Sequence, residues 1–208
     1  MSLRPDLQII ADWIAPDARV LDLGCGDGAL LSYLQREKQC QGYGVEIDPN
    51  ALLAAMRAGV NVIQQDIEGG LEMFRGAHFD VVILSMAIQA THQTERVLRE
   101  MSEVGVQGVV SLPNFGHWYH VWSLLRGHMP LSKELPYQWF DTPNLHMTTV
   151  ADFEAFLASL DISIVGRAFL ADGTVVRALP RQRATQAIYR FRRQSGSLPA
   201  NLTGRNSP

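Results

Sequence analysis

Short apolar runs alternate with amphipathic segments along the first half of the chain. The apolar runs predict strands over residues 18–23, 42–46, 60–64, 79–84 and 107–112. Apolar residues at helical spacing predict helices over residues 3–14, 28–37, 49–57 and 93–104. Strands that are apolar on both faces and alternate with helices are typical of a parallel sheet covered on both sides by helices.

The pattern changes in the last quarter of the chain. A helix is predicted over residues 149–160, and two extended segments follow over residues 162–170 and 187–193, with no helix predicted between them. We expect these two segments to form an antiparallel hairpin at the end of the parallel sheet. The predicted fold is therefore a Rossmann-like α/β/α sandwich with a mostly parallel, seven-stranded sheet, formed by one domain over residues 1–193.

Two segments lie outside this alternation. Residues 114–147 are rich in aromatic side chains and irregular, although the stretch around His117 and His120 predicts an amphipathic helix that covers the domain. A long irregular loop in a compact domain is usually functional or disordered, and the aromatic content argues against disorder. Residues 194–208 are polar and carry glycine, serine and proline, which predicts a disordered tail.

Composition excludes several classes of function. The net charge of −3 gives no reason to expect a general affinity for nucleic acid or an anionic membrane. The two cysteines, Cys25 and Cys40, lack the spacing of a zinc site or a disulfide framework, so we expect no metal and a reducing compartment. No secretory signal is visible, and the longest apolar stretch, residues 79–90, is too short to span a bilayer. We therefore expect a cytoplasmic protein.

The first predicted strand runs into a glycine-rich loop with the sequence GCGDG, residues 24–28. Closely spaced glycines between a strand and a helix let the backbone approach a ligand closely. The loop fits the dinucleotide-binding pattern only if Ala29 takes the last glycine position. A pyrophosphate would lie on this turn, where the carboxylates of Asp22 and Asp27 are unfavourable neighbours, so these acids disfavour a dinucleotide.

S-adenosylmethionine reverses this argument because it carries an ammonium and a sulfonium group. Glu46 closes the second predicted strand 22 residues after Gly24, where its carboxylate can accept both hydroxyls of a ribose. Asp66 follows the third strand and can accept from an adenine amino group. The spacing of Glu46 suits either cofactor, but acids at the carboxyl ends of several parallel strands favour S-adenosylmethionine.

The sequence DLGCGDG at residues 22–28, together with Glu46, Asp66 and FDVVIL at residues 79–84, resembles the class I S-adenosylmethionine-dependent methyltransferases over about residues 7–193. The resemblance implies that an acid and the loop glycines hold the methionine end, and that the later acids hold ribose and adenine. The residues implied to bind S-adenosylmethionine or S-adenosylhomocysteine are Asp22, Gly24, Gly26, Gly28, Glu46, Ile47, Asp66, Ile67 and Ser85.

Three further motifs are similar to the MetW family of methionine biosynthesis proteins: LPNFGHW at residues 112–118, LPYQW at 135–139 and DTPNLH at 141–146. This resemblance implies a role in methionine synthesis beside the homoserine O-acyltransferase MetX. Two functions stay open. The chain either binds S-adenosylmethionine and modulates the acyltransferase, or is an active methyltransferase on an unidentified small molecule.

The sequence identifies no catalytic residue. Methyl transfer is a direct displacement that positioning alone can promote, and a general base is needed only when the acceptor atom must lose a proton. Residues that could contact a substrate or a partner are Asn114, His117, Tyr137, Trp139, Asp141 and His146. Asn114, at the end of the fifth strand, is expected to face the cofactor cleft. Aromatic residues also suit a protein interface, so the segment is predicted to be a substrate lid or a docking surface.

Overall fold

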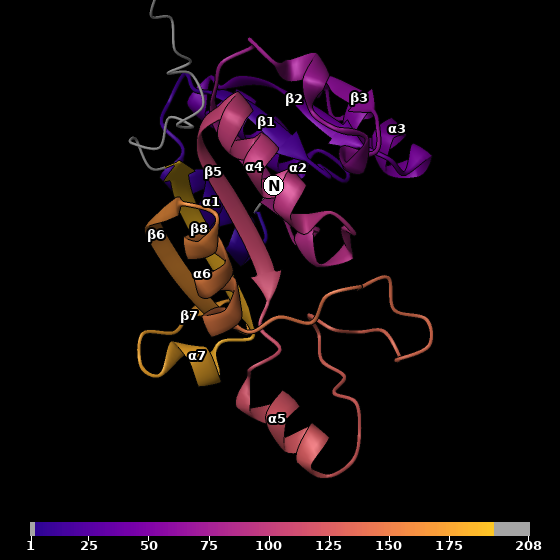
Figure 1. Ribbon diagram of the computed structural model, residues 1–208. Helices are drawn as coiled ribbons and strands as arrows, with labels where there is room; N and C mark the ends of the chain where they lie inside the picture. Colours follow the sequence, from indigo (N-terminus) through magenta and orange to yellow (C-terminus); the bar gives the residue numbers. More distant parts are fainter. Residues whose placement is uncertain (1–2, 194–208) are drawn as a thin grey trace, which may run out of the picture.

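The computed structural model of the protein describes residues 3–193, which are built around one eight-stranded sheet (Figure 1). The strand order is β3-β2-β1-β4-β5-β8-β6-β7. The strands are β1 (Arg19–Leu23), β2 (Gln41–Glu46), β3 (Val62–Gln64), β4 (Phe79–Ser85), β5 (Gly105–Pro113), β6 (Ile162–Ala171), β7 (Thr174–Val175) and β8 (Gln186–Arg193). The first five pair in parallel, as predicted.

The five helices that were predicted with bounds begin and end close to them. They are α1 (Pro5–Trp13), α2 (Ala29–Lys38), α3 (Pro49–Arg57), α4 (Thr94–Val104), α5 (Trp118–Leu125), α6 (Val150–Ser159) and α7 (Pro180–Arg183). Three 3-10 turns, η1 (Ile67–Gly69), η2 (Glu72–Phe74) and η3 (Ile88–Ala90), were not predicted because three residues carry no periodicity. Among residues 3–193, every helix is too short or too polar to cross a membrane.

The sheet separates two apolar cores, which confirms the three-layer architecture. Alternate residues of one strand face opposite layers, so Leu21 and Leu23 of β1 join one core whereas Val20 joins the other. The first core packs against α4 and α6, through residues such as Leu98 and Leu157. The second packs against α1, α2 and α3. Both faces of each central strand are therefore buried, which explains the continuous apolar runs in the sequence.

The antiparallel end of the sheet follows the prediction with two corrections. β8 lies between β5 and β6 and pairs antiparallel with both. β7 adds an eighth strand to the seven expected, and α7 forms where no helix was predicted. β7 has two residues and α7 has four, too few for either to show a pattern in the sequence. The prediction of a disordered tail concerns residues outside the described range.

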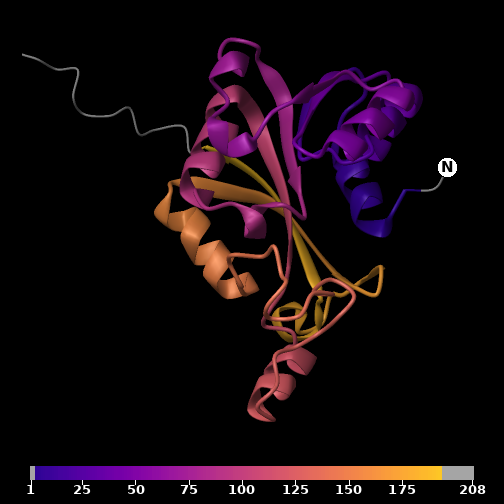
Figure 2. The same ribbon diagram turned by 90° about the vertical axis from the view of Figure 1, so that its right-hand side faces the viewer.

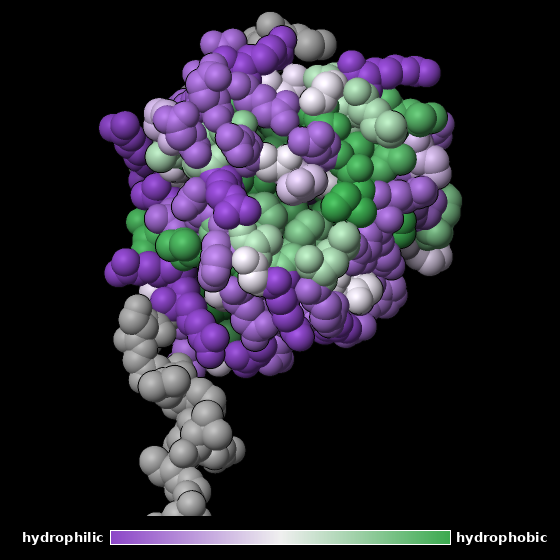
Figure 3. All heavy atoms as spheres, turned by 90° about the horizontal axis from the view of Figure 1, so that it is seen from above, coloured by the Kyte–Doolittle hydropathy of each residue, from purple (hydrophilic) through white to green (hydrophobic). Residues whose placement is uncertain are grey.

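The segment between β5 and α6 contains a helix, as predicted, but that helix does not cover the domain. Only His120 of α5 is buried, whereas Trp118, Trp122 and Leu125 are 58%, 53% and 75% exposed. α5 stands apart from the sheet in both ribbon views (Figures 1 and 2). Figure 3 shows the face at the other end of the molecule, seen from above. There a patch of hydrophobic residues is bordered by hydrophilic ones. The expectation of a covering helix was wrong because an apolar sequence pattern does not specify what it packs against.

One close contact between β5 and β8 gives a test of the fold. Gly108 of β5 lies opposite Phe191 of β8, and a Cβ at Gly108 would collide with the Phe191 ring. We expect Gly108→Ala to destabilise the protein by about 1–3 kcal/mol through overpacking, measured by urea unfolding. Gly69→Ala is the control, because a Cβ there meets nothing within 4 Å. Equal midpoints for the two variants would contradict the β5–β8 register.

Candidate cofactor cleft

A cleft of about 660 Å³ lies where the carboxyl ends of β1 and β4 meet the glycine loop, residues 24–28. Helices α1 and α2 form its other walls. The residues that line it are Leu3, Arg4, Leu7, Asp22, Gly24, Cys25, Gly26, Asp27, Ala29, Leu30, Ser32, Tyr33, Arg36, Ala54, Ala58, Ser85 and Met86. In a parallel sheet this edge is where ligands bind.

The glycine loop has a conformation that side chains disfavour. Gly24, Gly26 and Gly28 have φ values of 67°, 58° and 74°, in the left-handed region. The backbone N–H groups of Gly24 and Cys25 both donate to the carbonyl of Val45 on β2, at 2.8 and 3.0 Å. The loop therefore folds back against the end of β2 and turns its backbone toward the cleft.

Glu46, the last residue of β2, fixes this loop. Its Oε2 accepts from the Gly26 N–H at 2.7 Å, and its Oε1 accepts from the N–H groups of Ile47 and Asp48, each at 2.9 Å. The side chain is buried. A carboxylate offers about four acceptor positions, so these three bonds leave about one for a ligand. Two ribose hydroxyls, as predicted for Glu46, would share this position or replace one of the backbone bonds.

Asp22 is the second buried carboxyl of the cleft, at 3% exposure. Burial, and then the charge of Glu46, raise the pKa of Asp22 from its ordinary value of 3.8 to about 7. No hydrogen bond contributes to this shift, in contrast to the bonds that Glu46 receives. A cation placed in the cleft would favour the ionised form of Asp22, and an anion would oppose it.

The other two polar residues of the loop are not positioned to attack or to bind phosphate. Burial, and then the charges of Asp22 and Glu46, raise the pKa of the Cys25 thiol to about 12, so it is no nucleophile at neutral pH. The Oδ1 of Asp27 accepts from the Ala29 N–H at 3.1 Å. Its carboxylate therefore already occupies the start of α2, where a pyrophosphate would otherwise bind.

The structure brings four of the predicted cofactor residues together on the cleft: Asp22, Gly24, Gly26 and Ser85. Glu46 joins them through the Gly26 N–H. The other four do not line the cleft. Gly28 lies against Ala55 of α3 and Val60 before β3, Ile47 is exposed, Asp66 caps η1 by accepting from the Glu68 N–H, and Ile67 packs on the core.

Asn114 does not line the cleft, and the expectation that it faces the cofactor was wrong. Its side chain is fully buried, and its Nδ2 donates to the carbonyls of Arg181 and Ala184 at 2.9 and 2.8 Å. Its Oδ1 accepts from the N–H groups of Gly116 and Val150. These bonds use the whole amide to join the end of β5 to α6 and α7.

The remaining candidates from residues 114–147 are dispersed. Tyr137 and Trp139 line a small aromatic pocket of about 140 Å³, Asp141 is exposed, and His146 lines a separate pocket described below. His117 lies against His120, with ring centroids 5.3 Å apart, and burial lowers the pKa of both imidazoles. None of these residues lines the cleft.

Sequence reasoning missed part of the cleft wall. Arg4 and Leu7 come from the start of the chain, whereas Tyr33 and Arg36 lie along α2. Arg4 pairs with Asp6 at 3.0 Å, which holds it beside the cleft. Nothing local in the sequence marks these residues, because only the packing of α1 against α2 brings them to the glycine loop.

The strand order and the glycine loop at the carboxyl end of β1 define the S-adenosylmethionine-dependent methyltransferase fold. A crystal structure of an S-adenosylmethionine-dependent methyltransferase from Archaeoglobus fulgidus superposes with a TM-score of 0.66, over 89% of this chain and 90% of that one, at 16% identity. Residues 4–191 match the family model of the methionine biosynthesis protein MetW. The chain therefore belongs to the MetW family.

Two curated proteins are similar to the chain, and the first carries MetW in its name. The chain is 33% identical over 174 residues to the bifunctional methionine biosynthesis protein MetXA/MetW of Rhodopirellula baltica. That match covers 79% of this chain but only 28% of the longer relative. A malonyl-[acyl-carrier protein] O-methyltransferase of Enterobacter lignolyticus is 25% identical over 88% of this chain and 78% of its own length.

The raised pKa of Asp22 predicts how stability depends on pH. The folded chain binds this proton more tightly than the unfolded chain, so the contribution to stability is fully present below about pH 4 and is lost as the pH rises through about 7. Asp22→Asn cannot ionise. We expect wild type to lose roughly 2–4 kcal/mol more than this variant between pH 4 and pH 8.

Urea unfolding of wild type, Asp22→Asn and the control Asp12→Asn at pH 4, 6 and 8 measures this difference. Asp12 is exposed on α1, so its variant should follow wild type. If Asp22→Asn shows the wild-type dependence as well, Asp22 is ionised at neutral pH and the electrostatic description of the cleft is wrong.

Proposed function

We propose that the chain binds S-adenosylmethionine in this cleft. The observation that carries the proposal is the buried Asp22 carboxyl, which receives no hydrogen bond and lies beside a left-handed glycine loop. The ammonium of the methionine end and the nearby sulfonium would be the cationic partners that the Asp22 carboxylate does not have within the protein. The carboxylate of Asp27 at the start of α2 makes the same loop unfavourable for a dinucleotide.

The rest of the cofactor follows the strand order. Glu46 ends β2, next to β1, and offers one remaining acceptor position to a ribose hydroxyl. Asp66 and Ile67 follow β3, the next strand outward, and would lie along the adenine. Arg4, on the wall of the cleft, is a cation within the site that could meet the carboxylate of the methionine end.

Substitution of Glu46 tests this placement. Glu46→Gln replaces an acceptor of three N–H groups and a ribose hydroxyl by an amide, and each bond to a charged group contributes about 1.5–3 kcal/mol. We expect calorimetry to show S-adenosylmethionine affinity at least about tenfold weaker in this variant. Glu37→Gln, an exposed change on α2, should bind as wild type does. Unchanged affinity in Glu46→Gln would remove Glu46 from the site.

We also propose that the chain acts with a homoserine O-acyltransferase of the MetX type in methionine synthesis. The Rhodopirellula baltica relative, whose printed name joins MetXA and MetW, supports this association. The surface that suits it is the apolar face of residues 118–147, which we call the α5 face. Its large exposed apolar residues include Trp118, Trp122, Leu125, Trp139 and Phe140.

This α5 face has the composition of an interface. Trp and Tyr are frequent energetic anchors at protein interfaces, and Trp139 and Phe140 are 71% and 69% exposed with their rings in edge contact. None of these side chains lines the proposed cofactor cleft. Partner binding and cofactor binding are therefore assigned to different residues, and each can be altered separately.

Trp139→Ala separates the docking surface from a substrate lid. We expect it to weaken association with the acyltransferase by about thirtyfold, since the loss of an aromatic anchor costs about 2 kcal/mol, with S-adenosylmethionine affinity unchanged. Biolayer interferometry measures the first quantity and calorimetry the second. Tyr43→Ala, an exposed aromatic residue on β2, is the control. Unchanged association combined with loss of a methylated product would favour the alternative, an active methyltransferase.

A further inference from the structure

A second pocket, of about 430 Å³, lies between η3, the first turn of α4 and α6. It shares no lining residue with the cofactor cleft. Its floor is apolar, with Phe153 and Phe156 of α6, and its polar lining includes Gln89, Glu95, His146 and Asp152. The proposed function leaves this pocket without a role.

Gln89 is the residue that points to a ligand. Its side chain is 93% buried, and its Nε2 donates to the carbonyl of Met86 at 2.8 Å. This bond fixes the orientation of the amide and leaves Oε1 with no donor among the described residues. An unsatisfied buried acceptor costs about 1–3 kcal/mol. Oε1 has almost no exposed surface in this conformation, so a ligand that turns the Gln89 side chain and brings an N–H group to Oε1 would recover that cost.

The charge of the lining favours a cation. Glu95 and Asp152 contribute two carboxylates, and the lining contains no lysine or arginine. Glu95 also pairs with Arg99 on the same helix at 2.9 Å, and Asp152 accepts from the Thr149 hydroxyl at 2.7 Å, so each keeps acceptor positions for a cation but neither is a bare charge. The aromatic rings of Phe153 and Phe156 can attract a cation through their faces and can also hold an apolar body. The pocket therefore favours a ligand with an N–H donor, a positive charge and an apolar body. An ammonium group supplies the first two, because it is charged and only donates hydrogen bonds.

We propose that this second pocket binds a small ammonium compound with an apolar body. The ammonium lies toward Gln89 and the two carboxylates, and the apolar body lies on the phenylalanines. Because the pocket and the cleft share no lining residue, the compound and a ligand of the cleft can be bound at the same time. The proposal does not depend on what the cofactor cleft binds.

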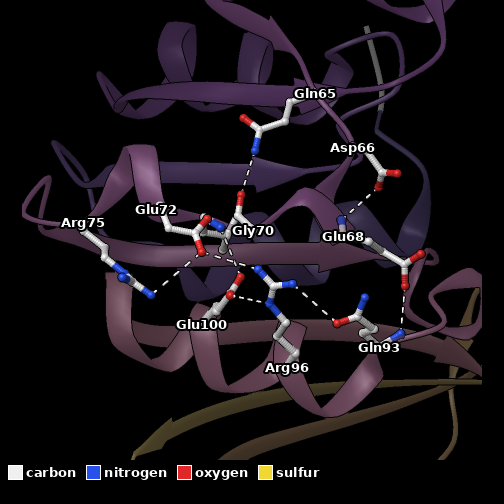
Figure 4. A network of polar contacts seen from close by, with 10 residues as sticks. Gln65, Asp66, Glu68, Gly70, Glu72, Arg75, Gln93, Arg96 and Glu100 are labelled. Atoms are coloured by element: carbon white, nitrogen blue, oxygen red, sulfur yellow. Dashed lines mark hydrogen bonds and ion pairs between the residues drawn. The ribbon is translucent and has the colours of Figure 1, made fainter.

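One hydrogen bond joins the second pocket to the cofactor cleft, and Glu68 links the pocket rim to the predicted adenine residues. Gln89 holds the carbonyl of Met86, a cleft residue whose φ of 53° is left-handed. Glu68, which follows the predicted adenine residues, accepts from the Gln93 N–H at 2.8 Å (Figure 4). It also pairs with His92 at the pocket rim. A ligand that moves Gln89 would therefore change the environment of Met86 in the cleft. A cleft ligand that moves Met86 would in turn change the affinity of the second pocket.

Three small probes with the same ring test the proposal. Benzylamine, benzyl alcohol and benzoate carry an ammonium, a neutral donor and an anion, and each is titrated at pH 8 into the full chain with ¹⁵N-labelled backbone. We expect benzylamine to shift the amides of residues 93–95 and 152–156 with millimolar saturation. The alcohol should bind about fivefold more weakly, and benzoate more weakly still. Gln89→Leu should weaken benzylamine and abolish the response of the Met86 amide.

Removal of the charge provides the matched variants. Glu95→Gln/Asp152→Asn should lower the affinity for benzylamine to that for benzyl alcohol while the alcohol binds as before, which also shows that the pocket is intact. Glu103→Gln, on the same helix but outside the pocket lining, should leave all three affinities unchanged. Equal binding of the three probes, or benzylamine shifts confined to residues 22–28, would overturn the proposal.

Discussion

Two carboxyl groups, Asp22 and Glu46, are buried close together at the carboxyl edge of the sheet, and the geometry of the cleft depends on how each is stabilised. Glu46 accepts three backbone N–H bonds and so holds the glycine loop against the end of β2. Asp22 receives none and stays partly protonated near neutral pH. One carboxyl is thus satisfied by the protein itself, and the other by a proton or by a cation that enters the cleft.

This arrangement follows from the parallel sheet, and most of it could be predicted from the sequence. Strands buried on both faces read as continuous apolar runs, and the parallel order brings Asp22, Glu46 and Ser85 to one edge. Periodicity cannot register the two residues of β7 or the four of α7. It also cannot distinguish α5 from a helix that covers the sheet, because both have the same apolar spacing. They differ only in whether the apolar side chains pack against the domain or are exposed to solvent.

Asn114 illustrates a second limit of sequence reasoning. Its place after β5 was correct, but the groups that it binds, the carbonyls of Arg181 and Ala184, are about seventy residues away in the chain. Gln89 is the converse case. It has no motif around it, and only the structure reveals an amide buried between the cleft and the second pocket. In both cases the role of the side chain depends on long-range contacts.

The proposed sites lie in three separate regions of the described chain: the cleft beside the glycine loop, the second pocket beside Gln89, and the exposed α5 face. The cleft and the pocket are joined by the hydrogen bond from Gln89 to Met86, whereas the exposed aromatic residues of the α5 face lie outside both linings. The proposed cofactor and partner sites can therefore be altered separately, whereas a ligand that moves Gln89 would affect the cleft.

The central claim is that Asp22 exchanges its proton for the positive charge of S-adenosylmethionine. Proton release on binding tests this most directly, by calorimetry at pH 6 in buffers of different ionisation enthalpy. With a pKa of about 7, Asp22 is about nine-tenths protonated there, so binding should release nearly one proton. Neither Asp22→Asn nor the ligand methylthioadenosine, which lacks the ammonium, should show this release. If wild type binds S-adenosylmethionine and releases no more protons than Asp22→Asn does, the account is wrong.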